Sequence, residues 1–315
     1  MDHNQTILGS IEPDITQRLV SRREAILKGA AVGSSVAAGL AMMSAPIAFA
    51  ALSREAFGQG TPMSVQAVID FALKLEIFEN EFYKAVLGIS AVAAQNAAFA
   101  AVRAMVPAAA LPAIQQIQKH ETEHVAFLMA NGAVNSLNLT ASSFDFTGGR
   151  GSGTGPFLQA TADVSFLLLT AQGAEDTGVR AYKGQAPNLQ SNPGVLEAAL
   201  RIHSVEARHA SKIRRLRRIY TAATKVKYSG TITGGGATAA GADNVSNPAA
   251  GAVTALGMIY AGEDNVTQGG VNVTTLPNLP SGIDVTAAAT EAFDEPLSAS
   301  AVVAIVQPFF IPSLS

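Results

Sequence analysis

The stretch His120-Glu121-Thr122-Glu123-His124 is the most informative part of the sequence, because a related stretch follows at His203-Ser204-Val205-Glu206-Ala207-Arg208-His209. Each contains the pattern Glu-x-x-His, made by Glu121 with His124 and by Glu206 with His209. Three residues turn an α-helix by about 300°, so each glutamate shares a helix face with its histidine, one turn apart. A carboxylate and an imidazole placed in this way can bind one divalent metal ion together, or bridge two.

A second pair of motifs alternates with the first. Glu76 precedes Tyr83 by seven residues, Glu175 precedes Tyr182 by seven residues, and a lysine follows each tyrosine. Seven residues are close to two helical turns, so each tyrosine lies on the face of its glutamate. The order Glu-x6-Tyr-Lys and then Glu-x-x-His occurs twice, which indicates an internal duplication of a helical hairpin.

Hydrophobic periodicity predicts four long helices, over residues 65–87, 112–131, 157–183 and 193–220. Gly184 is expected to end the third helix, and an alanine-rich helical piece over residues 91–105 belongs to the first hairpin. The glycine-rich stretch 144–156 is interpreted as a long, flexible connection between the hairpins. It has no Gly-Lys-Ser/Thr sequence and no preceding strand, so a phosphate-binding loop is not expected. A short amphipathic helix is predicted near 298–306.

The composition excludes several classes of protein. Only 14% of the 315 residues are charged, and 21 Lys+Arg stand against 24 Asp+Glu. A disordered or nucleic-acid-binding protein would carry more charge or a basic excess. The absence of cysteine excludes disulfide frameworks, iron–sulfur clusters and thiolate zinc sites.

The first 50 residues are interpreted as an export signal. Arg22-Arg23 precede an uncharged stretch from Gly29 to Ala50, which ends in Ala48-Phe49-Ala50. Paired arginines before a weakly apolar segment resemble a twin-arginine signal, and the small-x-small ending is typical of a cleavage site. We therefore expect the protein to be periplasmic or otherwise exported, and to contact the membrane only during export. The alternative is an uncleaved anchor, since 22 residues can just span a bilayer.

Charge divides the rest of the chain into two parts. Residues 51–227, the predicted bundle, carry 17 basic and 13 acidic side chains. Residues 228–315 are rich in glycine, alanine and threonine and carry seven acids and no base, which predicts an irregular extension packed on the bundle. The four arginines within 214–218 form either a solvated face or a surface over which the acidic extension folds.

Di-iron and di-manganese bundles have a known ligand pattern. Two of their helices each supply one glutamate, and the other two helices each supply one Glu-x-x-His motif. With it the chain resembles the ferritin-like superfamily and, more narrowly, an exported ferritin-like family that includes desiccation-associated proteins. The stretches 75–83, 175–179 and 291–297 carry this narrower resemblance. It implies an all-α, ferritin-like four-helix bundle of two hairpins with a long crossover and an irregular C-terminal extension.

The resemblance also implies a site for two iron or manganese ions. Its metal ligands would be Glu76, Glu121, His124, Glu175, Glu206 and His209. Within this set, Glu121 and Glu206 would bridge the two ions. The side chains expected to support the ligands are Tyr83, Tyr182, Glu79 and His120. Glu81 is expected to face solvent, and His203 to be peripheral.

The expected function is redox chemistry on oxygen, peroxide or Fe(II), and no single residue is assigned as catalytic. Two alternatives remain open. The chain could bind metal without turnover, or it could protect or scaffold envelope components during drying, with the metal as a structural clamp. A homodimer is compatible with either.

Overall fold

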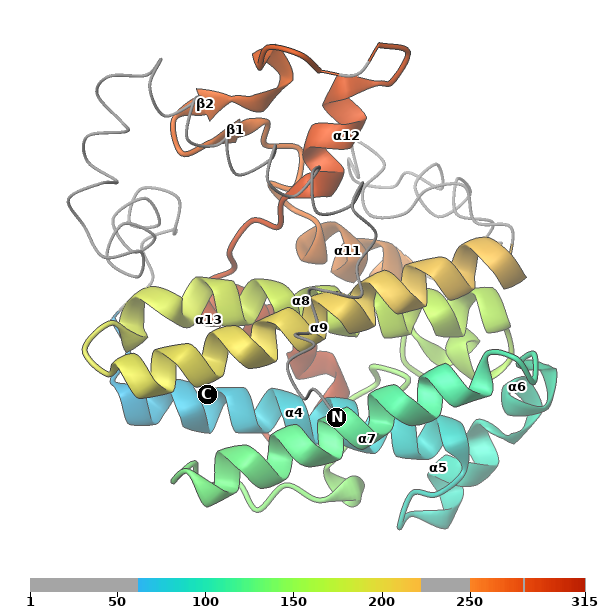
Figure 1. Ribbon diagram of the computed structural model, residues 1–315. Helices are drawn as coiled ribbons and strands as arrows, with labels where there is room; N and C mark the ends of the chain where they lie inside the picture. Colours follow the sequence, from blue (N-terminus) through green and yellow to red (C-terminus); the bar gives the residue numbers. More distant parts are fainter. Residues whose placement is uncertain (1–61, 222–249, 280, 315) are drawn as a thin grey trace, which may run out of the picture. The chain divides into compact units, whose positions relative to one another are not determined.

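Four long helices form a bundle in the computed structural model, which describes residues 62–221, 250–279 and 281–314. They are α4 (Val65–Leu87), α7 (Leu111–Ala130), α8 (Val164–Gln185) and α9 (Pro193–Tyr220) (Figure 1). Helix α4 packs mainly on α7, and α8 on α9, so the bundle consists of two helical hairpins. The expected all-α bundle is confirmed. The predicted signal at 1–50 and the first part of the extension, 228–249, lie outside the described residues.

Side-chain caps fix where the long helices begin. The Ser64 hydroxyl accepts a hydrogen bond from the amide of Ala67 (3.1 Å) at the start of α4. The Asp163 carboxylate accepts one from the amide of Phe166 (2.9 Å) at the start of α8. These contacts satisfy amide groups that have no partner within the helix. The predicted start of the third helix at residue 157 was therefore too early, because a separate turn of 3-10 helix, η3 (Leu158–Thr161), precedes the cap.

The alanine-rich piece of the first hairpin is two short helices rather than one. Helix α5 (Ala93–Ala98) and helix α6 (Ala100–Met105) meet at Phe99, whose side chain is buried. The Phe99 ring makes edge contacts with Phe82 of α4 (6.1 Å between ring centroids) and with Phe146 (6.3 Å). Insertion of this ring into the core accounts for the break.

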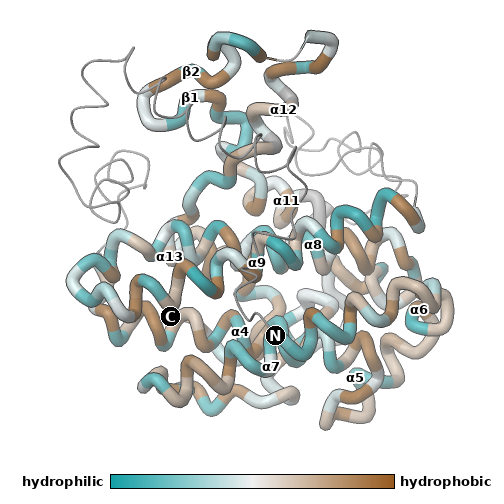
Figure 2. The backbone as a smooth tube through the Cα atoms, viewed as in Figure 1, coloured by the Kyte–Doolittle hydropathy of each residue, from teal (hydrophilic) through white to brown (hydrophobic). Residues whose placement is uncertain are grey.

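Apolar and polar residues alternate along the long helices, as Figure 2 shows, and the apolar ones meet in a single core. A cluster of phenylalanines forms one end of that core around Phe78 of α4. Its ring lies within 6.4 Å, between centroids, of the rings of Phe82, Phe144, Phe146, Phe309 and Phe310. These residues come from α4, from the connection between the hairpins and from the C-terminal segment, so the cluster joins three distant parts of the sequence.

The glycine-rich connection between the hairpins is held in place by the C-terminal segment. It begins at a 3-10 turn, η2 (Ala141–Ser143), and runs beside another, η6 (Gln307–Phe309). The amides of Asp145 and Arg150 donate to the carbonyl oxygens of Phe309 (2.8 Å) and Pro308 (3.0 Å). The predicted long connection is therefore present, and these contacts order it.

The described part of the C-terminal extension is made of short elements. They are α11 (Ala250–Ile259), a two-stranded antiparallel ladder of β1 (Thr267–Gln268) and β2 (Val271–Asn272), η5 (Val273–Thr275), α12 (Val285–Ala292) and α13 (Ala299–Val306). A further 3-10 turn, η4 (Ala186–Leu189), links α8 to α9. None of the helices in the described ranges combines the length and apolar character needed to cross a bilayer.

Arg180 of α8 binds the extension to the bundle. Its guanidinium is 1% exposed and donates to the carbonyl oxygens of Ile259, Ala261 (2.7 Å) and Glu295 (2.6 Å). Its Nε also lies 3.2 Å from Oε1 of Glu263. The planar guanidinium supplies five donors in a fixed geometry, which suits several acceptors on one side.

The extension lies against the backbone of α8 near Gly184. A Cβ atom at this position would stand only 1.9 Å from the carbonyl oxygen of Leu297. Gly184 does not end the third helix, as was predicted, but allows this close approach inside α8, which continues to Gln185.

The arginine run at the end of α9 is only partly solvated. Arg217 is buried and donates to Oε1 of Gln172 (2.7 Å), and Arg214 pairs with Asp176 of α8. Tyr260 of the extension also donates to Asp176 (2.7 Å). The extension therefore reaches this charged network through a tyrosine, and its carboxylate Glu263 pairs with Arg180 instead.

We expect the substitution Arg180→Met to destabilise the protein by about 3 kcal/mol, because it removes the cation beside the buried carboxylate of Glu263 and three hydrogen bonds to backbone carbonyl groups. Urea unfolding of the full chain, followed by circular dichroism, measures the change. Arg201→Met is the matched control, since the Arg201 side chain is 77% exposed and pairs with Glu197 at the surface. Equal stability of the two variants would contradict the role assigned to Arg180.

The Asp145 carboxylate organises the connection. Its Oδ1 accepts from the amide and hydroxyl of Thr147 (3.0 and 2.6 Å), and its Oδ2 from the amides of Gly151 and Gly153 (both 2.9 Å). Burial alone would raise the pKa of Asp145, but these hydrogen bonds outweigh it and lower the pKa below 3.8. The charged carboxylate therefore stabilises the folded protein above pH 3.8, and this contribution is lost as the pH falls through the lowered pKa.

The variant Asp145→Asn should lose about 2 kcal/mol of stability at neutral pH, because an amide NH2 would face donor groups. The stability difference from the wild type should shrink below pH 3.8. Urea unfolding at several pH values, with exposed Glu197→Gln as the control, tests both points. A difference that stays constant with pH would show that the charge of Asp145 is not responsible.

Candidate metal centre

Each of the four long helices places one glutamate at the centre of the bundle. Glu76 comes from α4, Glu121 from α7, Glu175 from α8 and Glu206 from α9, and none is more than 1% exposed. His124 and His209, one turn after Glu121 and Glu206, are buried beside them. The structure therefore brings together all six residues that the two motifs indicated.

The six residues divide into two groups that share two members. Glu76 and His124 form one group with Glu121 and Glu206, and in this group the candidate ligand atoms all lie within 4.8 Å of one another. Glu175 and His209 form the other group with the same two glutamates, under the same limit. Glu121 and Glu206 therefore occupy the positions expected of carboxylates that bridge two ions.

The surroundings of His124 resemble a coordination shell more than a hydrogen-bond pattern. Its Nδ1 lies 3.0 Å from Oε2 of Glu76, 3.1 Å from Oε2 of Glu121 and 3.1 Å from Oε1 of Glu206. One ring nitrogen carries at most one proton, so it cannot donate to three carboxylates at once. Neighbouring ligands of an ion with bonds of about 2.1 Å stand about 3 Å apart, which is the spacing found here.

Several atoms of the second group lack a hydrogen-bond partner. His209 Nδ1 lies 2.8 Å from Oε1 of Glu121 and 3.2 Å from Oε2 of Glu175, yet these contacts do not have hydrogen-bond geometry. Among the described residues, the buried site atoms without a hydrogen bond are Glu121 Oε1, Glu175 Oε2, both Glu206 oxygens and His209 Nδ1. Buried polar atoms are rarely left unsatisfied, and donor atoms of this kind fit a cation.

Two tyrosines link the hairpins across the site. The Tyr83 hydroxyl of α4 donates to Oε1 of Glu175 on α8, and the Tyr182 hydroxyl of α8 donates to Oε1 of Glu76 on α4 (2.5 Å). Burial, followed by the adjacent carboxylate, raises the pKa of each tyrosine well above its usual value. Both hydroxyls therefore keep their protons and act as donors. Each tyrosine therefore donates a hydrogen bond to the glutamate of the other copy of the repeat. The spacing within one helix could not indicate this pairing.

The remaining predicted neighbours lie at the edge of the ligand set. His120 Nδ1 is 2.8 Å from Nε2 of His209, and the two rings are stacked. Glu79 is buried near Glu206, and both approach α8 at Gly178, where a Cβ atom would stand 3.2 Å from Glu206 Oε2 and 3.3 Å from Glu79 Oε1. Gly178, which sequence reasoning did not identify, leaves space for these two carboxylates.

The prediction for Glu81 is wrong, whereas His203 lies where it was expected. Glu81 was expected to face solvent, but it is only 9% exposed, because it pairs with Lys84 one turn later (2.7 Å). His203 lies at the periphery, where its Nδ1 contacts the carbonyl oxygen of Val179 (3.0 Å).

The carboxylates hold more negative charge than the two histidines can balance. Burial raises the pKa of Glu121 to about 7, although the adjacent imidazoles of His124 and His209 oppose this rise. Burial, followed by neighbouring carboxylates, raises the pKa values of Glu206 and Glu79 well above normal. Burial would also raise the pKa of Glu76, but His124 outweighs it and the pKa is lowered. Protons occupy such a site when cations do not, and metal binding displaces them.

Comparison with known proteins agrees with this geometry. Residues 64–218 match the family model described as the ferritin-like domain. No curated protein and no solved structure matches the chain. The narrower resemblance to exported, desiccation-associated relatives stays a prediction. The matched stretch contains all four long helices and all six candidate ligands. Residues 64–218 of this chain are therefore similar to the ferritin-like domain.

Proposed function

We propose that the ferritin-like domain binds two iron or manganese ions and carries out redox chemistry with them. One observation carries this proposal: two buried groups of carboxylate and imidazole atoms share Glu121 and Glu206, and several of these atoms have no hydrogen bond. Glu76 and His124 would hold one ion, Glu175 and His209 the other, and the shared glutamates would bridge them.

The donor set favours iron or manganese. Each ion would receive oxygen ligands and one imidazole, a combination that suits these metals and provides no thiolate. Four carboxylates balance the charge of two divalent ions, so burial leaves no net charge at the site. When bound, such ions supply one-electron steps at a fixed place in the protein.

The protein contributes the orientation of the ligand side chains. The Tyr83 and Tyr182 hydroxyls hold one oxygen of Glu175 and of Glu76, which leaves the other oxygen of each for a ligand bond. His120 contacts Nε2 of His209 and so orients its Nδ1 toward the carboxylates. Both contacts reduce the freedom of a ligand before any ion arrives.

A small molecule has a route to this centre. An open hollow of about 530 Å³ between α7 and α9 reaches His124, and its charged lining residues are Glu123, Glu197 and Arg201. Oxygen, hydrogen peroxide or Fe(II) is small enough for this route. We therefore propose oxidation of Fe(II) or removal of peroxide as the reaction.

We also propose that the chain is exported. The twin-arginine-type sequence within 1–50 and the absence of cysteine support this location.

A second candidate function, metal binding without turnover, is favoured by the burial of the four glutamates. Ions bound there would neutralise core charge and clamp four helices. In that case the protein would be a stable envelope component during drying, as a monomer or a homodimer, and not an enzyme.

The first expected result is metal content. Protein purified from its export compartment should contain about two Fe or Mn per chain by elemental analysis. The double variant Glu121→Gln/Glu206→Gln should contain almost none, because each ion loses both shared ligands. Glu123→Gln is the control, since Glu123 is on the same helix and 60% exposed. Two retained metal ions in the double variant would refute the site.

The second expected result concerns turnover. Metal-loaded protein should release oxygen from hydrogen peroxide or should oxidise added Fe(II), measured with an oxygen electrode and by absorbance. The double variant should lose whichever activity the wild type shows, while Lys119→Gln, at a 65% exposed position of the same helix, should keep it. Full metal content with no turnover in both assays would favour the clamp over the enzyme.

A further inference from the structure

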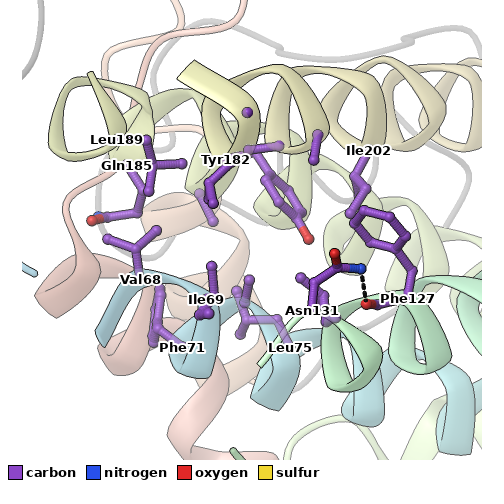
Figure 3. A pocket seen from close by; sticks show the side chains of 17 residues that line it. Val68, Ile69, Phe71, Leu75, Phe127, Asn131, Tyr182, Gln185, Leu189 and Ile202 are labelled. Carbon is purple, nitrogen blue, oxygen red and sulfur yellow. Dashed lines mark hydrogen bonds between the residues drawn. The ribbon is translucent and has the colours of Figure 1, made fainter. Parts of the chain in front are cut away.

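A cavity of about 290 Å³ lies inside the bundle between α4, α7, α8 and α9, apart from the ligand atoms of the metal centre. Figure 3 shows the side chains that surround it, which rise from all four helices. Most are apolar, including Val68, Leu75, Leu189 and Ile202. Protein interiors are close-packed, and an empty space of this size lowers the stability of the fold. A bound molecule that fills it would restore the lost packing contacts.

The polar side chains that border the cavity already have partners. The Tyr182 hydroxyl donates to Glu76, the Asn131 amide donates to the carbonyl oxygen of Phe127 (2.7 Å), and Oε1 of Gln185 accepts from Asn188 (2.9 Å). A buried water molecule needs two to four polar partners, and this lining offers few. The chemistry of the wall therefore favours an apolar occupant over water or a charged ligand.

The cavity adjoins the open hollow that reaches His124. Both are bordered by Phe127, Gly194, Ala198 and Ile202. Phe127 is 42% exposed, although it is a large aromatic residue, and it lies at the edge of the cavity in Figure 3. A ligand can therefore enter from the solvent side of α7 and α9 without opening the bundle.

We propose that this cavity is a binding site for an apolar organic molecule, an alkyl chain or fused-ring group of about ten carbon atoms. The size follows from the volume, since a cavity of about 150 Å³ holds a benzene ring. The bound molecule lies against the ring of Tyr182, whose hydroxyl holds Glu76, so it occupies the space next to the metal centre. Binding itself requires no metal ion and goes beyond the proposed redox function.

Fluorescence titration of the full chain with N-phenyl-1-naphthylamine tests the site, with 1-decanol as the competitor. Wild-type protein should bind about one probe per chain, and decanol should displace it. Ala198→Trp fills the cavity from α9 and should weaken probe binding at least tenfold, that is by about 1.4 kcal/mol. Ala126→Trp, at an exposed position of α7 outside the cavity, should bind like the wild type.

A second variant covers the case in which Ala198→Trp does not fold. Ile202→Ala enlarges the cavity and should shift the preference from decanol toward dodecanol, a change that loss of structure does not produce. No saturable probe binding by the wild type, or an unchanged alcohol preference in Ile202→Ala, would overturn the proposal. Metal content is measured in parallel, so probe binding by a chain that never holds metal would separate this site from the proposed redox centre.

Discussion

Four carboxylates enclosed at the centre of a helical bundle are the constraint on which the rest of the structure depends. An isolated buried carboxylate is strongly unfavourable, and two histidines supply at most two positive charges to Glu76, Glu121, Glu175 and Glu206. The tyrosine hydroxyls and the space at Gly178 reduce this cost locally. Neither supplies positive charge. A pair of divalent cations would, which is why we propose a dinuclear site.

Helix α8 separates two polar systems that lie back to back. Glu175 faces the metal centre, while the next residue, Asp176, pairs with Arg214 and accepts from Tyr260 of the extension. Arg180, further along the same helix, holds the extension through backbone carbonyls. The extension therefore stabilises the helix that carries the candidate ligand Glu175, although in the described residues it contributes no member of the candidate ligand groups.

The two hollows differ chemically, although they adjoin each other. The open one reaches His124 and carries charged side chains, whereas the cavity is mostly apolar and borders Tyr182. His124 and Tyr182 both contact Glu76, so each hollow is one side chain away from the same carboxylate. Because the hollows share part of their lining, a small reactant and an apolar molecule would approach this carboxylate from the same side of the bundle.

The sequence by itself determined the helices, their order and the six residues of the candidate site. Helical spacing is local, so Glu121 with His124 and Glu206 with His209 had to share a face, and the fourth helix begins at Pro193 as expected. The contacts between separate elements could be known only from the folded structure. The Tyr83 and Tyr182 hydroxyls donate to glutamates of the opposite hairpin, Glu81 of α4 is buried in the folded bundle, and Gly184 allows the close approach of Leu297. These contacts join residues on separate elements or depend on the packing around them, and no periodicity within one segment encodes that.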